Sequence, residues 1–77
     1  MVAGLLTHTE LSGPEADRVF HALSDSTRRD ILARAIQREQ SVSSLARHYE
    51  ISLTAVQKHV VVLERAALVS KHRSGRE

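Results

Sequence analysis

The sequence contains no cysteine, which excludes disulfide bonds, thiolate metal sites and cysteine nucleophiles. It also has no tryptophan, one phenylalanine and one tyrosine, so aliphatic side chains must build the core. No segment approaches the roughly 20 consecutive apolar residues that a membrane-spanning helix needs. We therefore expect a cytoplasmic protein that has no membrane role and folds without disulfides.

Proline and glycine are scarce as well, and their placement predicts a helical chain. The single proline is Pro14, and after it neither proline nor glycine occurs until Gly75. The 77 residues make one small domain with a thin core, which favours association with further copies or further chain. We assign residues 1–13 to a flexible N-terminal arm and residues 14–77 to the domain.

Charge is distributed unevenly between the two halves of the chain. Residues 1–40 carry five arginines against six acidic residues, a net charge of −1, whereas residues 41–77 carry six basic against three acidic residues, a net charge of +3. A basic half beside a nearly neutral half is typical of a protein that binds a polyanion. The net charge of the whole chain is only +2, so this pattern needs support from motifs.

Helix-start signals divide the chain into four predicted helices. Pro14 suits the first turn of a helix that ends near residue 23, and Asp25 is a suitable N-cap for a second helix to residue 37 or 38. A third helix is predicted from residues 41–43 to about residue 50. Ser52 can cap a fourth that starts at Leu53 after a turn of three or four residues. Two helices joined in this way are typical of a helix-turn-helix.

The fourth helix contains three consecutive valines, which by themselves favour a strand. A helical wheel favours the helix, because the apolar side chains fall within about 40° of one another at 100° per residue. These side chains are Val56, Val60, Leu63 and Ala67. The opposite side carries Thr54, Lys58, Val61 and Arg65, with Gln57 on the flank. We interpret His59, which lies near the apolar stripe, as a packed and hydrogen-bonded histidine.

The last residues predict the start of a β-hairpin. Leu68–Arg73 alternates loosely in the manner of a strand, and Ser74-Gly75 is a turn signal. The second strand of this hairpin would follow Glu77, so the hairpin is expected to be incomplete in this chain.

Three segments of the sequence resemble the winged-helix repressors of the ArsR/SmtB type. They are ALSDSTRRDILARAI, SVSSLARHYEISLTAVQKHVVVLERAALV and SKHRSGRE, in the order and spacing of that family. The resemblance covers about Val19 to Arg76. It implies a mainly α fold, a winged helix-turn-helix of four helices plus a β-hairpin wing, and no cofactor.

The resemblance implies a repressor that binds double-stranded DNA as a homodimer. Residues 53–66 would be the recognition helix in the major groove, and the basic wing would begin at residue 69. Gln57 can bind an adenine edge, Lys58 a guanine or a phosphate, and Thr54 a base or a phosphate. Ser43 and Ser52 are candidate phosphate contacts besides their capping roles, Leu53 can touch a thymine methyl group, and Arg73 and Arg76 would contact the backbone from the wing.

Two departures from the family pattern concern the fourth helix. Val61 occupies an outward place where the family commonly carries a basic or small polar side chain. Ala67 replaces the usual glycine after the recognition helix, and a left-handed conformation there would cost alanine on the order of 1 kcal/mol. Proteins of this type usually dimerise through their terminal helices. The C-terminal one, expected after the wing, is absent from these 77 residues, so the dimer that the resemblance implies rests here on the N-terminal helix alone.

Alternative functions remain open at this point. Many members of the family sense metals, and a metal-responsive repressor would need ligands outside this chain, because its five histidines form no cluster on one helix face. A small-molecule effector is equally possible. A winged helix that binds protein would suit the outward valines. An enzyme is not expected, because paired carboxylates, a phosphate-binding loop and an activated nucleophile are all missing.

Overall fold

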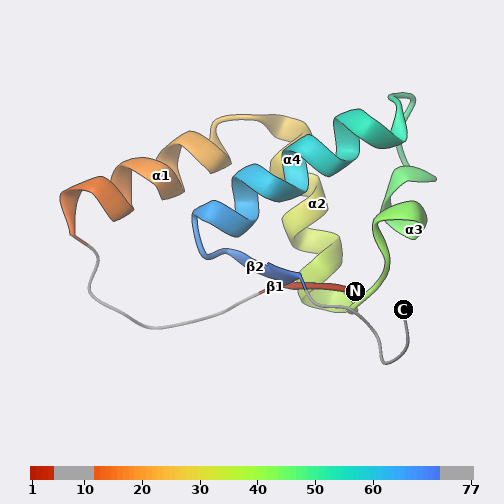
Figure 1. The fold of residues 1–77 in the computed structure, drawn as a ribbon, viewed down its shortest axis with the longest axis horizontal. Coiled ribbons are helices and arrows are strands. Elements are labelled where there is room, and N and C mark those ends of the chain that lie inside the picture. Colours follow the sequence, from red (N-terminus) through yellow and green to blue (C-terminus); the bar gives the residue numbers. More distant parts are fainter. Residues whose placement is uncertain (5–11, 72–77) are drawn as a thin grey trace.

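The computed structural model describes residues 1–4 and 12–71, and these residues form four helices and two short strands (Figure 1). The helices are α1 (Gly13–Leu23), α2 (Ser26–Gln37), α3 (Val42–Ala46) and α4 (Leu53–Arg65). The strands are β1 (Val2–Gly4) and β2 (Val69–Lys71). The predicted number of helices is confirmed within the described part of the chain.

Each helix begins at a side chain that accepts a hydrogen bond from the first helical turn. Ser12 and Glu15 form a reciprocal capping box at α1. Asp25 accepts from the Arg28 amide at 2.9 Å and caps α2, and this bond holds the pKa of the Asp25 carboxyl below its usual value. Ser41 and Ser52 cap α3 and α4 in the same way. The helix starts were therefore readable from the sequence.

The core lies where α4 crosses the other elements. α4 contributes Val56, Val60 and Leu63, all fully buried, and the helical assignment of the valine run is confirmed. The remaining buried apolar side chains come from every other helix, from both strands and from the C-cap of α4: Val2, Ala22, Ile31, Ala35, Leu45, Ala66 and Val69. The position of α4 is thus fixed by its inward stripe, which leaves its opposite side outward.

The strand pairing differs from the prediction. β2 begins at the predicted place, but its partner is β1, in antiparallel register with Val2 opposite Lys71 and Gly4 opposite Val69. Val2 is fully buried and also exchanges two backbone hydrogen bonds with Gln40, so residues 2–4 belong to the fold and not to a flexible arm. The cause is tertiary: β1 runs so close to α2 that a Cβ on Gly4 would lie 2.8 Å from the Ile36 nitrogen. Residues 72–77, where the wing was expected to turn, lie outside the described part.

α3 is shorter than predicted and its connection to α4 is longer. α3 ends at Ala46, and the connection spans residues 47–52. Arg47, His48 and Tyr49 donate their amides to carbonyls three residues earlier, so the chain tightens after α3. This tightening carries Tyr49 toward α2, where its hydroxyl donates to the Asp30 carboxylate at 2.6 Å.

α4 ends in a left-handed residue, as the missing glycine suggested. Ala67 has a φ of 60°. The Leu68 amide donates to the Leu63 carbonyl at 3.0 Å and the Ala67 amide to the Glu64 carbonyl at 2.9 Å, the two bonds of a Schellman motif. Alanine therefore adopts the conformation that usually selects glycine, at some cost in stability.

Together these elements form a winged helix-turn-helix. α3 and α4 pack against each other and contribute Leu45 and Val56 to the shared core, α1 and α2 support them, and β2 follows α4 and pairs with β1. None of the described helices is long and apolar enough to cross a membrane.

Candidate nucleic-acid interface

One side of α4 carries polar side chains that face solvent, and we call it the outer face of α4. It consists of Thr54, Gln57, Lys58, Val61 and Arg65. The four polar side chains are exposed and Val61 is partly exposed. Together with Val62 they line a shallow hollow of about 350 Å³. The wheel prediction for these side chains is confirmed, because the stripe on the other side of α4 is buried.

The polar side chains of the outer face of α4 have no partner within the described residues. Thr54, Gln57, Lys58 and Arg65 form no side-chain hydrogen bond and no salt bridge there. Each group is therefore hydrated in the isolated chain and can exchange water for another partner without breaking the fold. The donor and acceptor set includes an amide, an ammonium, a guanidinium and a hydroxyl.

The N-terminal end of α4 is exposed beside this face. Leu53 is 45% exposed, and Ser52 accepts the Ala55 amide with its hydroxyl oxygen at 3.0 Å. The first turn also has backbone N–H groups without helical partners, and these favour an anion. Ser52 thus has the predicted capping role, and a phosphate could be bound beside it.

The remaining predicted contact residues are Ser43 on α3 and two arginines of the expected wing. Ser43 is exposed on α3, and its side chain forms no hydrogen bond within the described residues, because Ser41 supplies the cap and Ser44 donates to the Gln40 side chain. Its hydroxyl is therefore available to a ligand. Arg73 and Arg76 lie outside the described residues, so their role in a wing stays a prediction.

α4 is held at its middle by an arginine of α2. The Arg28 guanidinium donates to the Ala22 carbonyl at 2.9 Å and the His21 carbonyl at 3.1 Å, at the end of α1. It also lies 3.3 Å from His59 Nδ1 on α4. Because a guanidinium has only donors, Nδ1 accepts in this contact, which fits a neutral ring with its proton on Nε2. The prediction that His59 is hydrogen-bonded is confirmed, and its side chain is partly exposed.

A second polar cluster ties α2 to the turn after α3. Asp30 accepts from the Tyr49 hydroxyl and from Arg34 Nε at 2.8 Å. These two bonds, that with Tyr49 first, lower the pKa of Asp30. Burial, followed by the bond to Asp30, raises the pKa of Tyr49 to about 12. The cluster fixes the segment that leads into α4.

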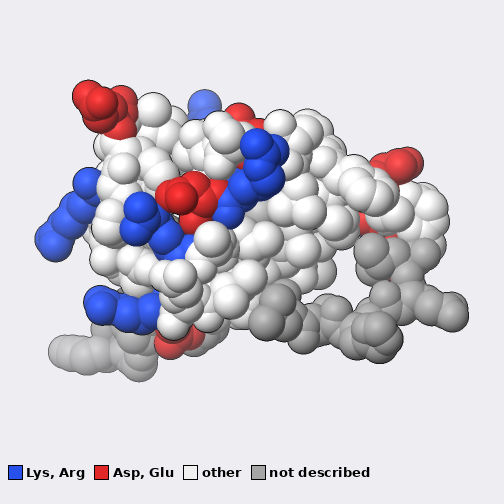
Figure 2. All heavy atoms as spheres, turned by 180° about the vertical axis from the view of Figure 1, so that it is seen from behind, with Lys and Arg blue, Asp and Glu red and all other residues white. Residues whose placement is uncertain are grey.

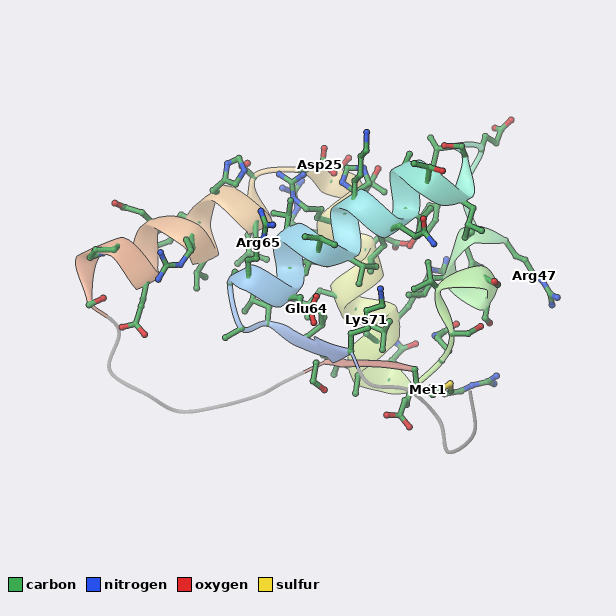
Figure 3. The ribbon with its side chains drawn as sticks, viewed as in Figure 1. Met1, Asp25, Arg47, Glu64, Arg65 and Lys71 are labelled. Carbon is green, nitrogen blue, oxygen red and sulfur yellow. The ribbon has the colours of Figure 1, made fainter. Side chains whose placement is uncertain are left out.

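Charge elsewhere on the molecule is mixed. Figure 2 shows the molecule from behind, and blue and red side chains lie next to each other there, so neither sign of charge dominates that face. The exposed basic side chains that the sequence-based site omitted include Arg47, Arg65 and Lys71 (Figure 3). Arg65 shares the outer face of α4, a position that the helical wheel already indicated.

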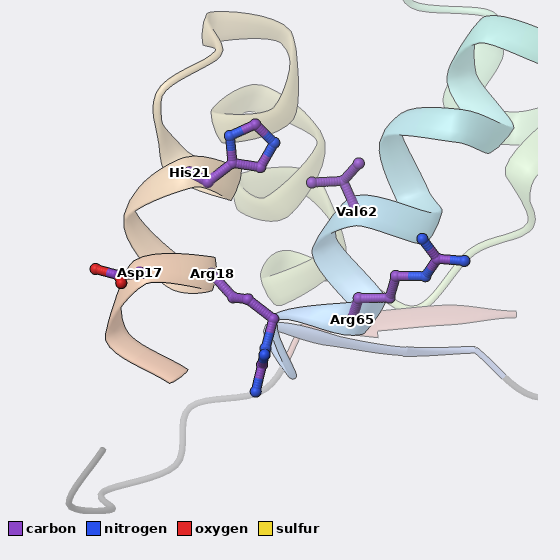
Figure 4. A pocket seen from close by; sticks show the side chains of 5 residues that line it. All are labelled: Asp17, Arg18, His21, Val62 and Arg65. Atoms are coloured by element: carbon purple, nitrogen blue, oxygen red, sulfur yellow. The ribbon is translucent and has the colours of Figure 1, made fainter. Parts of the chain in front are cut away.

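A second hollow, of about 300 Å³, lies between α1 and the end of α4 (Figure 4). His21 on α1 and Val62 on α4 point toward each other across it, and Arg65 forms part of its edge. Among the residues that the structure describes, no group of three or more His, Asp or Glu side chains could hold a metal ion.

Known proteins resemble this chain over the segment that contains the outer face of α4. The family model described as a helix-turn-helix domain matches residues 23–72. The chain belongs to the helix-turn-helix domain family. The matched segment contains α2, α3, α4 and β2.

Two curated relatives are named as transcription regulators. The transcriptional repressor SdpR of Bacillus subtilis (strain 168) is 36% identical over 59 residues, which is 77% of this chain and 66% of that protein. The HTH-type transcriptional regulator Rv2034 of Mycobacterium tuberculosis (strain ATCC 25618 / H37Rv) is 41% identical over 59 residues, which is 77% of this chain and 55% of that protein. This helix-turn-helix chain thus spans less than two thirds of the length of either relative.

Proposed function

We propose that this chain is a sequence-specific DNA-binding transcriptional regulator, a repressor of the ArsR/SmtB type that acts in the cytoplasm. The observation that carries the proposal is the state of the outer face of α4. Its polar groups point outward and have no partner among the described residues. The membership in the helix-turn-helix family and the names of two relatives support the same function.

Each residue of the interface has a chemical role in this proposal. α4 enters the major groove of double-stranded DNA, where its dimensions fit. Gln57 binds the N6 and N7 edge of an adenine, and Lys58 binds a guanine or a phosphate. Thr54 and Leu53 contact bases from the first turn, Ser43 and Ser52 contact phosphates, and the wing after Val69 adds Arg73 and Arg76 on the backbone.

The base-reading role of Gln57 can be tested with operator duplexes selected from a random library. Gln57→Ala should lose about 1–3 kcal/mol of binding free energy on the selected site, because a bidentate amide contact is lost, and almost nothing on random DNA. Arg76→Ala should weaken binding to both duplexes alike. Gln57 would not read a base if its variant lost equal affinity on both duplexes.

A salt titration separates DNA binding from the alternative of a protein-binding winged helix. Phosphate contacts release counterions, so the affinity for mixed-sequence duplex should fall steeply as salt rises, and Lys58→Ala should make the slope shallower by about one unit. An affinity that is absent or independent of salt would favour the protein-binding module.

The proposed regulator acts as a homodimer, as a two-fold arrangement on a palindromic site requires. The support is Phe20, which is 72% exposed on α1, a helix that extends away from the body of the molecule (Figure 1). Phe20→Ser should shift the chain to the monomer in sedimentation velocity, because the apolar contact is lost, without loss of helix content. A dimer that persists in this variant would place the interface elsewhere.

A further inference from the structure

Val61 is the member of the valine run that packing does not explain. Val60 is fully buried, and Val62 packs against the core cluster. Val61 is neither a member of that cluster nor packed against it. Val61 is partly exposed and lines the hollow on α4, together with Lys58 three residues before it and Arg65 four residues after it.

Folding offers no reason for an apolar residue at this position. Valine is a poorer helix former than lysine, glutamine or alanine by a few tenths of a kcal/mol. Its branched side chain also leaves apolar surface in water where the neighbouring side chains are polar. A gain from this side chain therefore has to come from a contact made in the bound state.

We infer that Val61 contacts the 5-methyl group of a thymine and so adds a base preference to the site. This inference rests on the proposed DNA binding by α4. The thymine methyl is the apolar group that base pairs present in the major groove, and an apolar side chain is its complement. The aliphatic stems of Lys58 and Arg65 flank Val61 and exclude water from the contact while their charges reach toward phosphates.

The position of the thymine follows from the geometry of the helix. Val61 lies four residues after Gln57, which is about 6 Å along the axis of an α-helix. Base pairs in a duplex are spaced by about 3.4 Å. If α4 lies along the groove, the thymine falls within about two base pairs of the adenine that Gln57 binds. Leu53 is eight residues from Val61, about 12 Å away, and would meet a different methyl group.

The test is a scan of the selected operator in which each thymine is replaced in turn by uracil, which removes the methyl group alone. At one thymine per recognition helix the wild-type chain should lose about three- to fivefold in affinity, the effect of one buried methyl group. Val61→Ala should show that loss on the unmodified duplex and no further loss with uracil at that position. Val61→Thr, similar in shape, should retain part of the preference.

Controls within the same helix keep the result interpretable. Leu53→Ala should still lose affinity, like the wild type, when the thymine that contacts Val61 is replaced by uracil. Any loss of sensitivity in this variant should concern a different thymine. Because Val61 lies outside the core cluster, its variants should unfold at the same temperature as the wild type by circular dichroism.

Two outcomes would overturn the inference without overturning the proposed function. One is a Val61→Ala variant that responds to every uracil exchange as the wild type does, while Gln57→Ala still loses its site; in that case the proposed function survives alone. The other is an unchanged uracil profile together with a changed sedimentation coefficient, which would assign Val61 to a protein contact. A chain that prefers no sequence at all would overturn the proposed function together with the inference.

Discussion

α2 and α4 both carry long polar side chains, but they use them in opposite ways. On α2, Arg28, Arg29 and Arg34 all bind groups of the protein: Arg28 and Arg29 donate to carbonyls at the end of α1, and Arg34 pairs with Asp30. On α4, Gln57, Lys58 and Arg65 bind nothing within the described residues. Polar composition alone therefore does not identify a binding surface.

The difference between the two helices assigns them different tasks. Arg28 and Arg29 of α2 donate to the carbonyls of the last turn of α1, so they contribute to the stability of the fold. The polar side chains of α4 keep their hydration until a partner arrives, so they contribute to binding. The contrast predicts that truncating an arginine of α2 to alanine lowers the free energy of unfolding, whereas truncating a polar side chain of α4 to alanine lowers the affinity for the partner.

The largest effect is expected for Arg28→Ala. This change removes the donor to the His21 and Ala22 carbonyls and the contact with His59, and should lower the free energy of unfolding by about 2 kcal/mol. Urea denaturation measures it. Lys58→Ala is the matched control on α4 and should change stability by less than about 0.5 kcal/mol. Similar losses for both variants would remove the distinction between the helices.

A smaller effect is expected at the Asp30–Tyr49 hydrogen bond. Tyr49 is the only tyrosine and there is no tryptophan, so its phenolate can be followed by ultraviolet absorbance. Tyr49 should titrate with a pKa of about 12 in the folded chain and with a pKa of about 10 in the chain unfolded in urea. The pKa is higher in the folded state, so the stabilisation is complete below the unfolded value and disappears as pH rises toward the folded value.

Two variants sharpen that measurement. Asp30→Asn should bring the pKa of Tyr49 nearer to its ordinary value, because the charged acceptor is lost. Tyr49→Phe should reduce stability at neutral pH by no more than about 1 kcal/mol, since the hydrogen bond is partly exposed. A tyrosine that titrates alike in the folded and unfolded chain would show that the bond to Asp30 does not form.

The smallest effect concerns the way the helices end. The last carbonyls of α1 accept hydrogen bonds from Ser24 and from arginines of α2, whereas those of α4 accept from the backbone amides that follow, with Ala67 at positive φ. Ala67→Gly should raise the free energy of unfolding by about 0.5–1 kcal/mol, because glycine adopts this conformation without strain. Ala66→Gly, at a φ of −87°, should lower it. Thermal unfolding measures both changes in stability. If the two variants were both more stable or both less stable than the wild type, the assigned cap would be contradicted.

Part of the site could be predicted from sequence because it depends on local rules. Asp25 and Ser52 cap the helices that they were expected to cap. Val56, Val60 and Leu63 are buried as the period of α4 required, whereas Ala67, the fourth predicted member of the inward stripe, is exposed because the helix ends before it. The Asp30–Arg34 pair also depends on helix spacing alone, and it forms at 2.8 Å.

Other features escaped prediction because they join distant segments. Arg29 could have paired with Asp25 four residues earlier, but it donates to the Leu23 carbonyl at 2.7 Å instead. The roles of Arg28 with His59 and of Tyr49 with Asp30 depend on how the helices cross. Nothing in the local sequence indicates that Val2 pairs with Gln40 and Lys71, because strand pairing between chain ends has no periodic signal.

The sequence by itself determined where the helices begin, which side of α4 is apolar, and that Ala67 would take the place of a glycine, since these follow from bonds and periods within a few residues. Only the tertiary structure decided which polar side chains are already bound. That choice depends on the distances between α1, α2 and α4, and it leaves the outer face of α4 hydrated while the arginines of α2 are engaged. The partner of β2 was decided in the same way, by the close packing of β1 on α2.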